Sequence, residues 1–81
     1  MTVKNRLIEL MGEKQMKEGR TINASIVARD TGLTRQVISK WMRGEVSEFR
    51  ADMVDRLCRY FKVQAGDLIY VDPDPRQSEQ N

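Results

Sequence analysis

Apolar residues recur at helical intervals through most of the chain. Near the start they fall on one stripe, which predicts a helix over 3–16 with Thr2 as its N-cap. The segment 12–21 is polar and contains two glycines, so we expect a fraying helix end that runs into a loop. The stripe consists of Val3, Leu7, Leu10 and Met11.

Two short helices joined by a tight turn are predicted in the middle of the chain. Asn23 is a favourable N-cap for the first, and Gly32 supplies the left-handed conformation that often follows a helix. Thr34 caps the second helix, 35–43, which stops at Gly44. Because the connecting turn is so short, the two helices must cross steeply.

The second half of the chain completes one small all-α domain. It predicts a fourth helix over 50–62, a short fifth helix or turn over 64–69, and some strand character at 69–72. The last residues, 72–81, contain two prolines and no large apolar residue, as is typical of a disordered tail. We therefore expect a compact bundle of four to five helices over 1–71, followed by that tail.

Basic residues are concentrated in the first part of the chain. The net charge is +2, but residues 1–45 carry nine Lys/Arg against five Asp/Glu, whereas residues 46–81 carry five against seven. Within 29–44 there are four basic residues and one acidic residue. This asymmetry favours a polyanionic partner, although a charged helix face is often simply solvated.

The predicted helix over 35–43 has two chemically distinct faces. Val37, Ile38 and Trp41 are spaced to face a core, and Ala28 is small enough to let the preceding helix approach. Packing alone accounts for these positions. The opposite face presents hydrogen-bond donors of the kind that the DNA major groove receives: Arg35, Gln36, Ser39, Lys40 and Arg43.

The spacing of four residues in this region is more specific than either helix alone: Ala28, Gly32, Ile38 and Trp41. This pattern resembles the helix-turn-helix of the phage repressor/Cro-like DNA-binding domains. The segment "DRLCRYFKVQAGDLI" and the first helix resemble the same family, so the likeness covers about residues 3–70. The resemblance implies a lambda-repressor-like fold and a transcriptional regulator that binds double-stranded DNA.

Three departures from the family pattern occur. The chain between the first two helices is longer than usual, with 13–20 as the extra segment. Ala24 stands where the family often has a glutamine that contacts a phosphate, and Gln64-Ala65 replaces a frequent Ser-Pro cap. We expect these changes to weaken one anchoring contact and to leave the fold intact.

The resemblance, carried over by position, implies two sets of DNA-contacting residues. Arginine suits guanine and glutamine suits adenine in the major groove, while a helix N-terminus suits a phosphate. The residues expected to read bases are Arg35, Gln36, Ser39 and Lys40. Those expected to bind phosphates are Thr34, Arg43 and Arg29.

The residue types present give no indication of catalysis. The chain lacks histidine, and its one cysteine, Cys58, falls on an apolar stripe. It has no glycine-rich phosphate loop. Charges interrupt the N-terminal segment too often for a signal peptide or a membrane span. We expect a cytoplasmic protein, located at the nucleoid when bound to DNA, that is not an enzyme and uses no metal, cofactor or membrane.

Two functions stay open from the sequence alone. The first is a sequence-specific regulator of transcription, expected to be a repressor, that reads double-stranded DNA with the helix 34–43 as a homodimer. The alternative is a protein-interaction module on the same scaffold, antitoxin-like or an anti-regulator, that binds a protein partner. Candidate dimer interfaces are 68–71, pairing as strands across a two-fold axis, and the outer face of the fourth helix. The basic outer face of 35–43 favours DNA.

Overall fold

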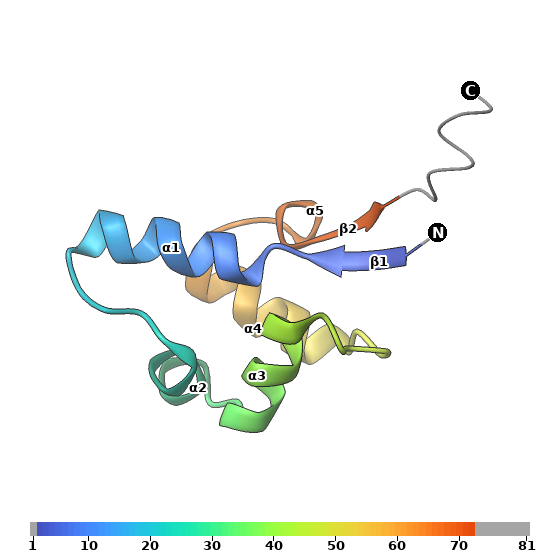
Figure 1. Cartoon of the computed structure of the whole chain (residues 1–81), viewed down its shortest axis with the longest axis horizontal. Coiled ribbons are helices and arrows are strands. Elements are labelled where there is room, and N and C mark those ends of the chain that lie inside the picture. Colours follow the sequence, from blue (N-terminus) through green and yellow to red (C-terminus); the bar gives the residue numbers. More distant parts are fainter. Residues whose placement is uncertain (1, 73–81) are drawn as a thin grey trace.

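The computed structural model describes residues 2–72, which form five helices and two short strands (Figure 1). The predicted all-α bundle of four to five helices is confirmed, with a two-stranded sheet added to it. In chain order the elements are β1 (Thr2–Asn5), α1 (Leu7–Glu18), α2 (Ala24–Thr31), α3 (Arg35–Arg43), α4 (Ala51–Phe61), α5 (Ala65–Leu68) and β2 (Ile69–Asp72).

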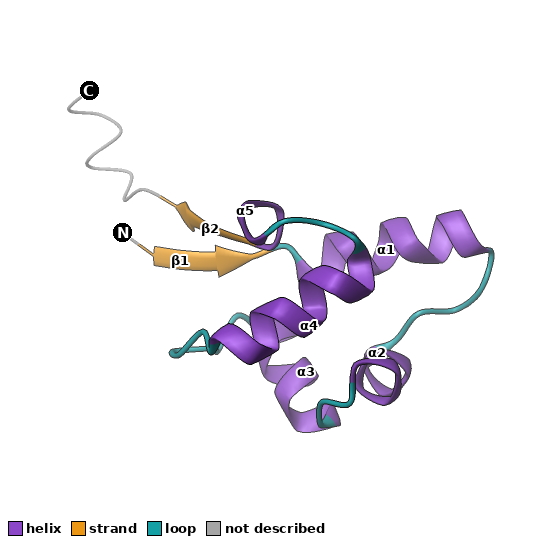
Figure 2. Ribbon diagram, turned by 180° about the vertical axis from the view of Figure 1, so that it is seen from behind, coloured by secondary structure: helices purple, strands orange, loops and turns teal. Residues whose placement is uncertain are grey.

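One apolar core receives side chains from all five helices. Each buried side chain of this size contributes about 1.5–3 kcal/mol relative to full exposure. Figure 2 shows the β1–β2 ribbon at the opposite end of the molecule from α2. The largest fully buried side chains are Leu7, Val27, Ile38, Trp41, Leu57 and Leu68.

The predicted helix over 3–16 is wrong at its start. Residues 2–5 form β1, which pairs antiparallel with β2 in the register Thr2↔Asp72 to Asn5↔Ile69. The helix begins only at Leu7, whose backbone N–H donates to Oδ1 of Asn5 at 3.1 Å, so Thr2 is not its cap. The local apolar pattern gave no signal for this strand, because the strand is stabilised by pairing with residues 69–72 near the other end of the chain.

The fraying expected over 12–21 does not occur, and the loop expected there begins only after Glu18. Helix α1 continues to Glu18 and ends at Gly19, which has a φ of 63°. Lys14 and Glu18 form an i,i+4 ion pair on its last turns, which supports helix where glycines suggested fraying. The extra segment 13–20 therefore lengthens a helix. The side chain of Gln15 then fixes the following loop, because its Oε1 accepts the N–H of Ile22 at 3.0 Å.

The ends of α2 and α3 are as predicted. Asn23 and Thr34 are their N-caps, and the side-chain oxygen of each accepts a backbone N–H three residues on, at 3.0 and 3.2 Å. Gly32 and Gly44 follow the helices with φ values of 77° and 71°. Each cap satisfies an N–H group that the helix itself leaves unpaired, and this fixes where both helices begin.

The C-terminal elements agree closely with the prediction. Helix α4 lies within the expected 50–62, the short α5 forms, and the strand character of 69–72 is realised as β2. The N–H of Gln64 donates to Asp67 Oδ2 at 3.2 Å, so an Asp side chain supports the start of α5 where the family often has Ser-Pro. Asp72 ends β2, and the rest of the predicted tail lies outside the described residues.

Candidate nucleic-acid interface

The turn between α2 and α3 is held by a side chain from α4. Nη1 of Arg56 donates to the carbonyl oxygens of Thr31 and Gly32 at 3.2 and 3.5 Å. Oγ1 of Thr31 donates in turn to the carbonyl of Val27 at 2.7 Å. A cation at the end of α2 also interacts favourably with the helix dipole. Arg56 thereby fixes the crossing of the two helices.

The inner face of α3 is anchored in the core. Ile38 and Trp41 are 0% and 1% exposed, and the Trp41 ring packs edge-on against Phe49 with centroids 5.3 Å apart. The prediction that Trp41 is a core residue is confirmed. With these side chains buried, the rotation of α3 about its axis is fixed, and its opposite face must point to solvent.

The outer face of α3 gathers most of the sequence-predicted site residues. Five of these residues lie on this face; Ser39 is half-buried, and Arg35, Gln36, Lys40 and Arg43 are exposed. Together they border an open hollow of about 480 Å³, lined by Arg35, Gln36, Ser39, Lys40 and Arg43. The four residues predicted to read bases thus lie side by side with one of the three predicted to bind phosphates.

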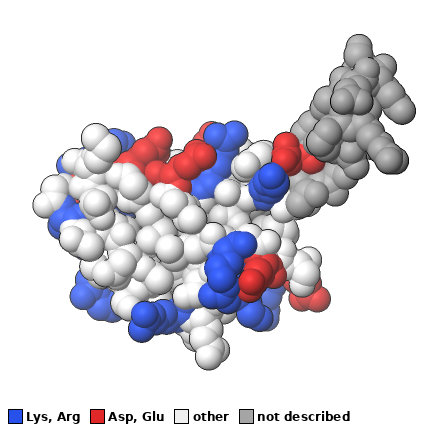
Figure 3. Space-filling view, in the orientation of Figure 1, with Lys and Arg blue, Asp and Glu red and all other residues white. Residues whose placement is uncertain are grey.

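The basic residues near α3 differ in whether they face a carboxylate. Nε of Arg43 lies 3.0 Å from Glu45, and Nε of Arg29, on α2, lies 3.1 Å from Asp30. Among residues 2–72, Arg35 and Lys40 have no carboxylate within 4.0 Å. In Figure 3 basic side chains line the lower edge, where Figure 1 places α2 and α3.

Thr34 lies at the N-terminal end of α3, next to the same face. Its Oγ1 accepts the N–H of Val37 at 3.2 Å, which leaves the hydroxyl proton free to donate. The first backbone N–H groups of a helix point outward and attract anions. A phosphate beside Thr34 would therefore meet both donors.

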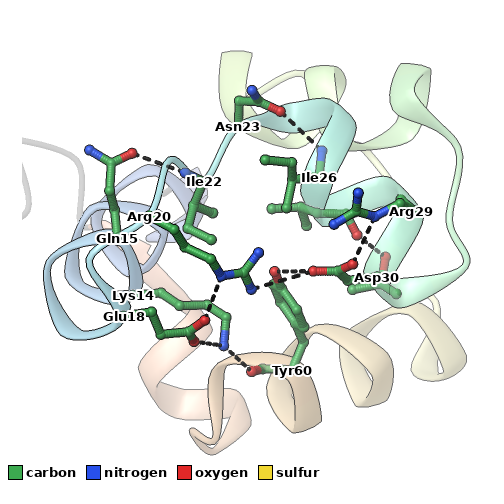
Figure 4. Close-up of polar contacts among 12 residues, drawn as sticks. Lys14, Gln15, Glu18, Arg20, Ile22, Asn23, Ile26, Arg29, Asp30 and Tyr60 are labelled. Atoms are coloured by element: carbon green, nitrogen blue, oxygen red, sulfur yellow. Dashed lines mark hydrogen bonds and ion pairs between the residues drawn. The ribbon is translucent and has the colours of Figure 1, made fainter.

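A polar network joins α1, α2 and α4 beside this surface (Figure 4). The hydroxyl of Tyr60 donates to Asp30 Oδ2 at 2.9 Å, and Arg20 bridges Glu18 at 2.7 Å and Asp30 at 3.6 Å. The Tyr60 hydrogen bond, and after it Arg29, lowers the pKa of Asp30. Burial, and after it the bond to Asp30, raises the pKa of Tyr60. These contacts brace the C-terminal end of α2 against α1 and α4.

A family model for the Cro/C1-type helix-turn-helix DNA-binding domain matches residues 6–74. The chain belongs to this family. It is also similar to the crystal structure of a candidate DNA-binding protein from Bacteroides fragilis, with a TM-score of 0.66 and 25% identity, covering 85% of this chain and 100% of that chain. No curated protein matches it. The resemblance predicted from the sequence is confirmed, and α2 and α3 are the helix-turn-helix of a Cro/C1-type domain.

Sequence reasoning missed the residues of this Cro/C1-type domain that hold the helix-turn-helix from behind. Arg56 and Tyr60 are four apart on α4, so they share one side of that helix, but their partners lie 24 to 30 residues earlier. Both residues lie off the apolar stripe of this helix, which consists of Val54, Leu57, Cys58 and Phe61, so periodicity gave no signal for their contacts. Spacing alone gives no reason to direct them toward α2.

Within the part of the chain that the structure describes, other kinds of site find no support. No group of three or more His, Cys, Asp or Glu residues there is placed to hold a metal ion. Each helix over 2–72 is too short or too polar to cross a lipid bilayer.

Proposed function

We propose that this protein is a transcriptional repressor that binds a specific double-stranded DNA sequence as a homodimer, with α3 in the major groove. The proposal rests on the exposure of the two charged residues predicted to read bases and on their lack of an ion-pair partner within residues 2–72. Arg35 and Lys40 are exposed on one face of a rigidly anchored helix and have no carboxylate partner over residues 2–72. Their donors are free for an external acceptor.

The chemistry of the exposed α3 residues assigns them different roles. Arg35 matches the O6 and N7 acceptors of guanine, and Gln36 matches N6 and N7 of adenine. Lys40 lies just over one turn beyond Arg35 and extends the contact along the groove. Ser39, which is half-buried, reaches only a base edge that comes close to the helix.

Phosphate contacts would hold α3 in register on the DNA. Thr34 offers its hydroxyl and the start of α3, while Arg43 and Arg29 each have a carboxylate neighbour. For these two arginines a phosphate replaces an exposed ion pair, which is itself worth about 0–1 kcal/mol. Binding therefore strengthens as salt falls, because each phosphate contact releases counterions from the DNA.

The small size of the reading surface supports a homodimer, and the small size of the domain supports repression. One recognition helix reads few base pairs, and helix-turn-helix proteins gain length by placing two copies on a palindrome. Over residues 2–72 the chain is a single small bundle. A domain of this kind regulates most simply by occupying a site that RNA polymerase needs.

The test begins with selection of bound duplexes from a random-sequence pool, followed by affinity measurements against salt. Arg35→Ala should weaken binding to the selected site by about 5- to 150-fold and relax the preference at one base pair. Arg59→Ala is the matched control, because Arg59 is an exposed arginine on α4 and its loss changes the net charge equally. It should leave the preference unchanged.

Two results would contradict the proposal. If no sequence is enriched, or if the two arginine variants weaken binding equally, α3 does not read bases, and the protein-interaction function becomes the better account. Repression is tested separately with a reporter whose promoter overlaps the selected palindrome. Expression of the protein should lower the signal, and Arg35→Ala should restore it.

A further inference from the structure

The β1–β2 ribbon extends from the helical bundle (Figure 2), and within residues 2–72 no further strand pairs with either of its outer edges. Val3 and Val71 face each other across the ribbon, yet they are 46% and 53% exposed. An exposed strand edge invites pairing with another strand unless charges or cover protect it. The question is which of the two outer edges is available, and to what.

The alternation of hydrogen-bonded and non-bonded residue pairs along the ribbon shows which backbone groups point outward. The N–H of Arg6 donates to the carbonyl of Leu68 at 2.8 Å, so these opposed residues form a bonded pair. In an antiparallel ladder bonded and non-bonded pairs alternate. Lys4 and Tyr70 are therefore the next bonded pair, and the N–H and C=O groups of Ile69 and Val71 point away from β1.

The two outer edges differ in their surroundings. Both views place β1 between β2 and α3 (Figures 1 and 2). The β1 edge borders a hollow of about 490 Å³ whose other side is α3, so a strand added there would have to fit between β1 and α3. The β2 edge lies on the outer side of the ribbon, and the residues on it, Ile69 and Val71, are apolar.

The residue at the centre of each strand also indicates which edge is the better site for pairing with a second copy. If a strand pairs with its own copy about a two-fold axis, the central residue meets itself in a non-bonded pair, with Cα atoms about 4.5 Å apart. At the β1 edge this would place Lys4 against Lys4, which is unfavourable. At the β2 edge it would place Tyr70 against Tyr70, and aromatic pairs are favourable there.

We propose that the outer edge of β2 is the homodimer interface, where two copies pair antiparallel about a two-fold axis at Tyr70 to form one four-stranded sheet. Ile69 of each copy then exchanges hydrogen bonds with Val71 of the other. This register pairs the strand most fully. An axis at Val71 would instead require an N–H from Pro73, which has none.

The dimer places both reading helices on one side of the new sheet. Nδ2 of Asn5 donates to the carbonyl of Trp41 at 2.9 Å, so the sheet face that carries Asn5 is the face toward α3. The two-fold axis of an antiparallel strand pair is perpendicular to the sheet. It therefore keeps the second α3 on the same side, where one DNA duplex can meet both helices.

The inference rests on the homodimer of the proposed function but not on base reading. The β2 interface and the base reading by α3 can therefore be refuted separately. The first test is crosslinking in a Cys58→Ser background under mild oxidation. Thiols of Tyr70→Cys would face each other at the axis, within the Cα range that a disulfide requires. Lys4→Cys, on the same face of β1, is the matched control. Only the first variant should yield a covalent dimer rapidly.

The second test removes one outward N–H from each edge. Val71→Pro removes a donor that β1 does not use and should raise the dissociation constant of the dimer by at least about tenfold. Val3→Pro removes the corresponding donor of β1 and should leave the dimer unchanged. Light scattering gives the mass, and circular dichroism confirms that each variant is folded. If Val71→Pro does not fold, Tyr70→Lys serves instead, because it places two like charges at the axis.

Three outcomes would overturn the inference. A wild-type protein that stays monomeric, both free and on its selected palindrome, has no such interface. Dissociation by Val3→Pro with no effect of Val71→Pro would assign the interface to β1. Rapid crosslinking through Lys4→Cys would do the same. A dimer that crosslinks through Tyr70→Cys yet enriches no DNA sequence would refute the proposed function and support the interface.

Discussion

Replacement of Gly32 by alanine tests how the turn between the two DNA-facing helices is held. Gly32 has a φ of 77°, a conformation that costs an L-residue about 1–2 kcal/mol. An added Cβ would lie 3.0 Å from Nη1 of Arg56, the atom that donates to the carbonyls at the end of α2. Displacement of that contact adds about 0.5–1.5 kcal/mol. We expect Gly32→Ala to lower the free energy of unfolding by about 1.5–3.5 kcal/mol.

Two other glycines separate these contributions. Gly44 has a φ of 71° and nothing within 4 Å of an added Cβ, so Gly44→Ala should cost only the conformational part, about 1–2 kcal/mol. Gly12 lies inside α1, also with nothing within 4 Å, and has no positive φ. Gly12→Ala should therefore stabilise the protein by about 0.5–1 kcal/mol, through higher helix propensity.

Urea unfolding followed by circular dichroism gives the three free energies. In a domain of this size each 1 kcal/mol also shifts Tm by about 4–8 °C. The Arg56→Ala change, alone and combined with Gly32→Ala, completes a double-mutant cycle, and the two effects should be less than additive. Equal costs for Gly32→Ala and Gly44→Ala, together with full additivity, would refute the role assigned to Arg56.

Three further predictions concern stability. Thr34→Ala should lower the free energy of unfolding by about 0.5–2 kcal/mol in urea titrations, whereas Thr21→Ala in the α1–α2 loop should not; equal effects would contradict the capping role. The bond from Tyr60 lowers the pKa of folded Asp30 below its ordinary 3.8, so its stabilising contribution is present above that pH and is lost as pH falls through the folded pKa. The urea midpoint of the wild type should thus fall more steeply below about pH 4 than that of Asp30→Asn, and parallel profiles would show that the bond is unimportant. Leu57→Ala removes a fully buried side chain and should cost about 2–5 kcal/mol by thermal unfolding, so a loss below 1 kcal/mol would contradict its place in the core.

The helix-turn-helix was predictable because its determinants are local. Asn23 and Thr34 cap helices through N–H groups three residues away, and Gly32 takes a conformation that its own lack of a Cβ permits. The exposure of the α3 donors follows from burial of Ile38 and Trp41 on the opposite face of the same helix. Each of these inferences spans no more than a few turns of chain.

The two errors in the N-terminal segment have different causes: the first came from a contact between distant segments, and the second came from local side-chain contacts. Val3 continues the apolar stripe of α1, so periodicity alone extends the helix back to it, but the strand pairing Val3↔Val71 stabilises the extended conformation instead. In the segment after Gly12, the ion pair on the last turns and the bond from Gln15 to Ile22 outweigh the weak helix propensity of glycine.

Sequence by itself determined helices α2 and α3 of this Cro/C1-type domain, their caps, and the donors that α3 presents, since all depend on residues less than about two turns apart. Only the tertiary structure decided that Arg35 and Lys40 have no carboxylate partner over residues 2–72, because a carboxylate from a distant segment could have packed against them, whereas Arg43 and Arg29 pair with their sequence neighbours Glu45 and Asp30. It also decided the edge at which a second copy would add, because the hydrogen-bond phase of β2 is set by a strand at the other end of the molecule.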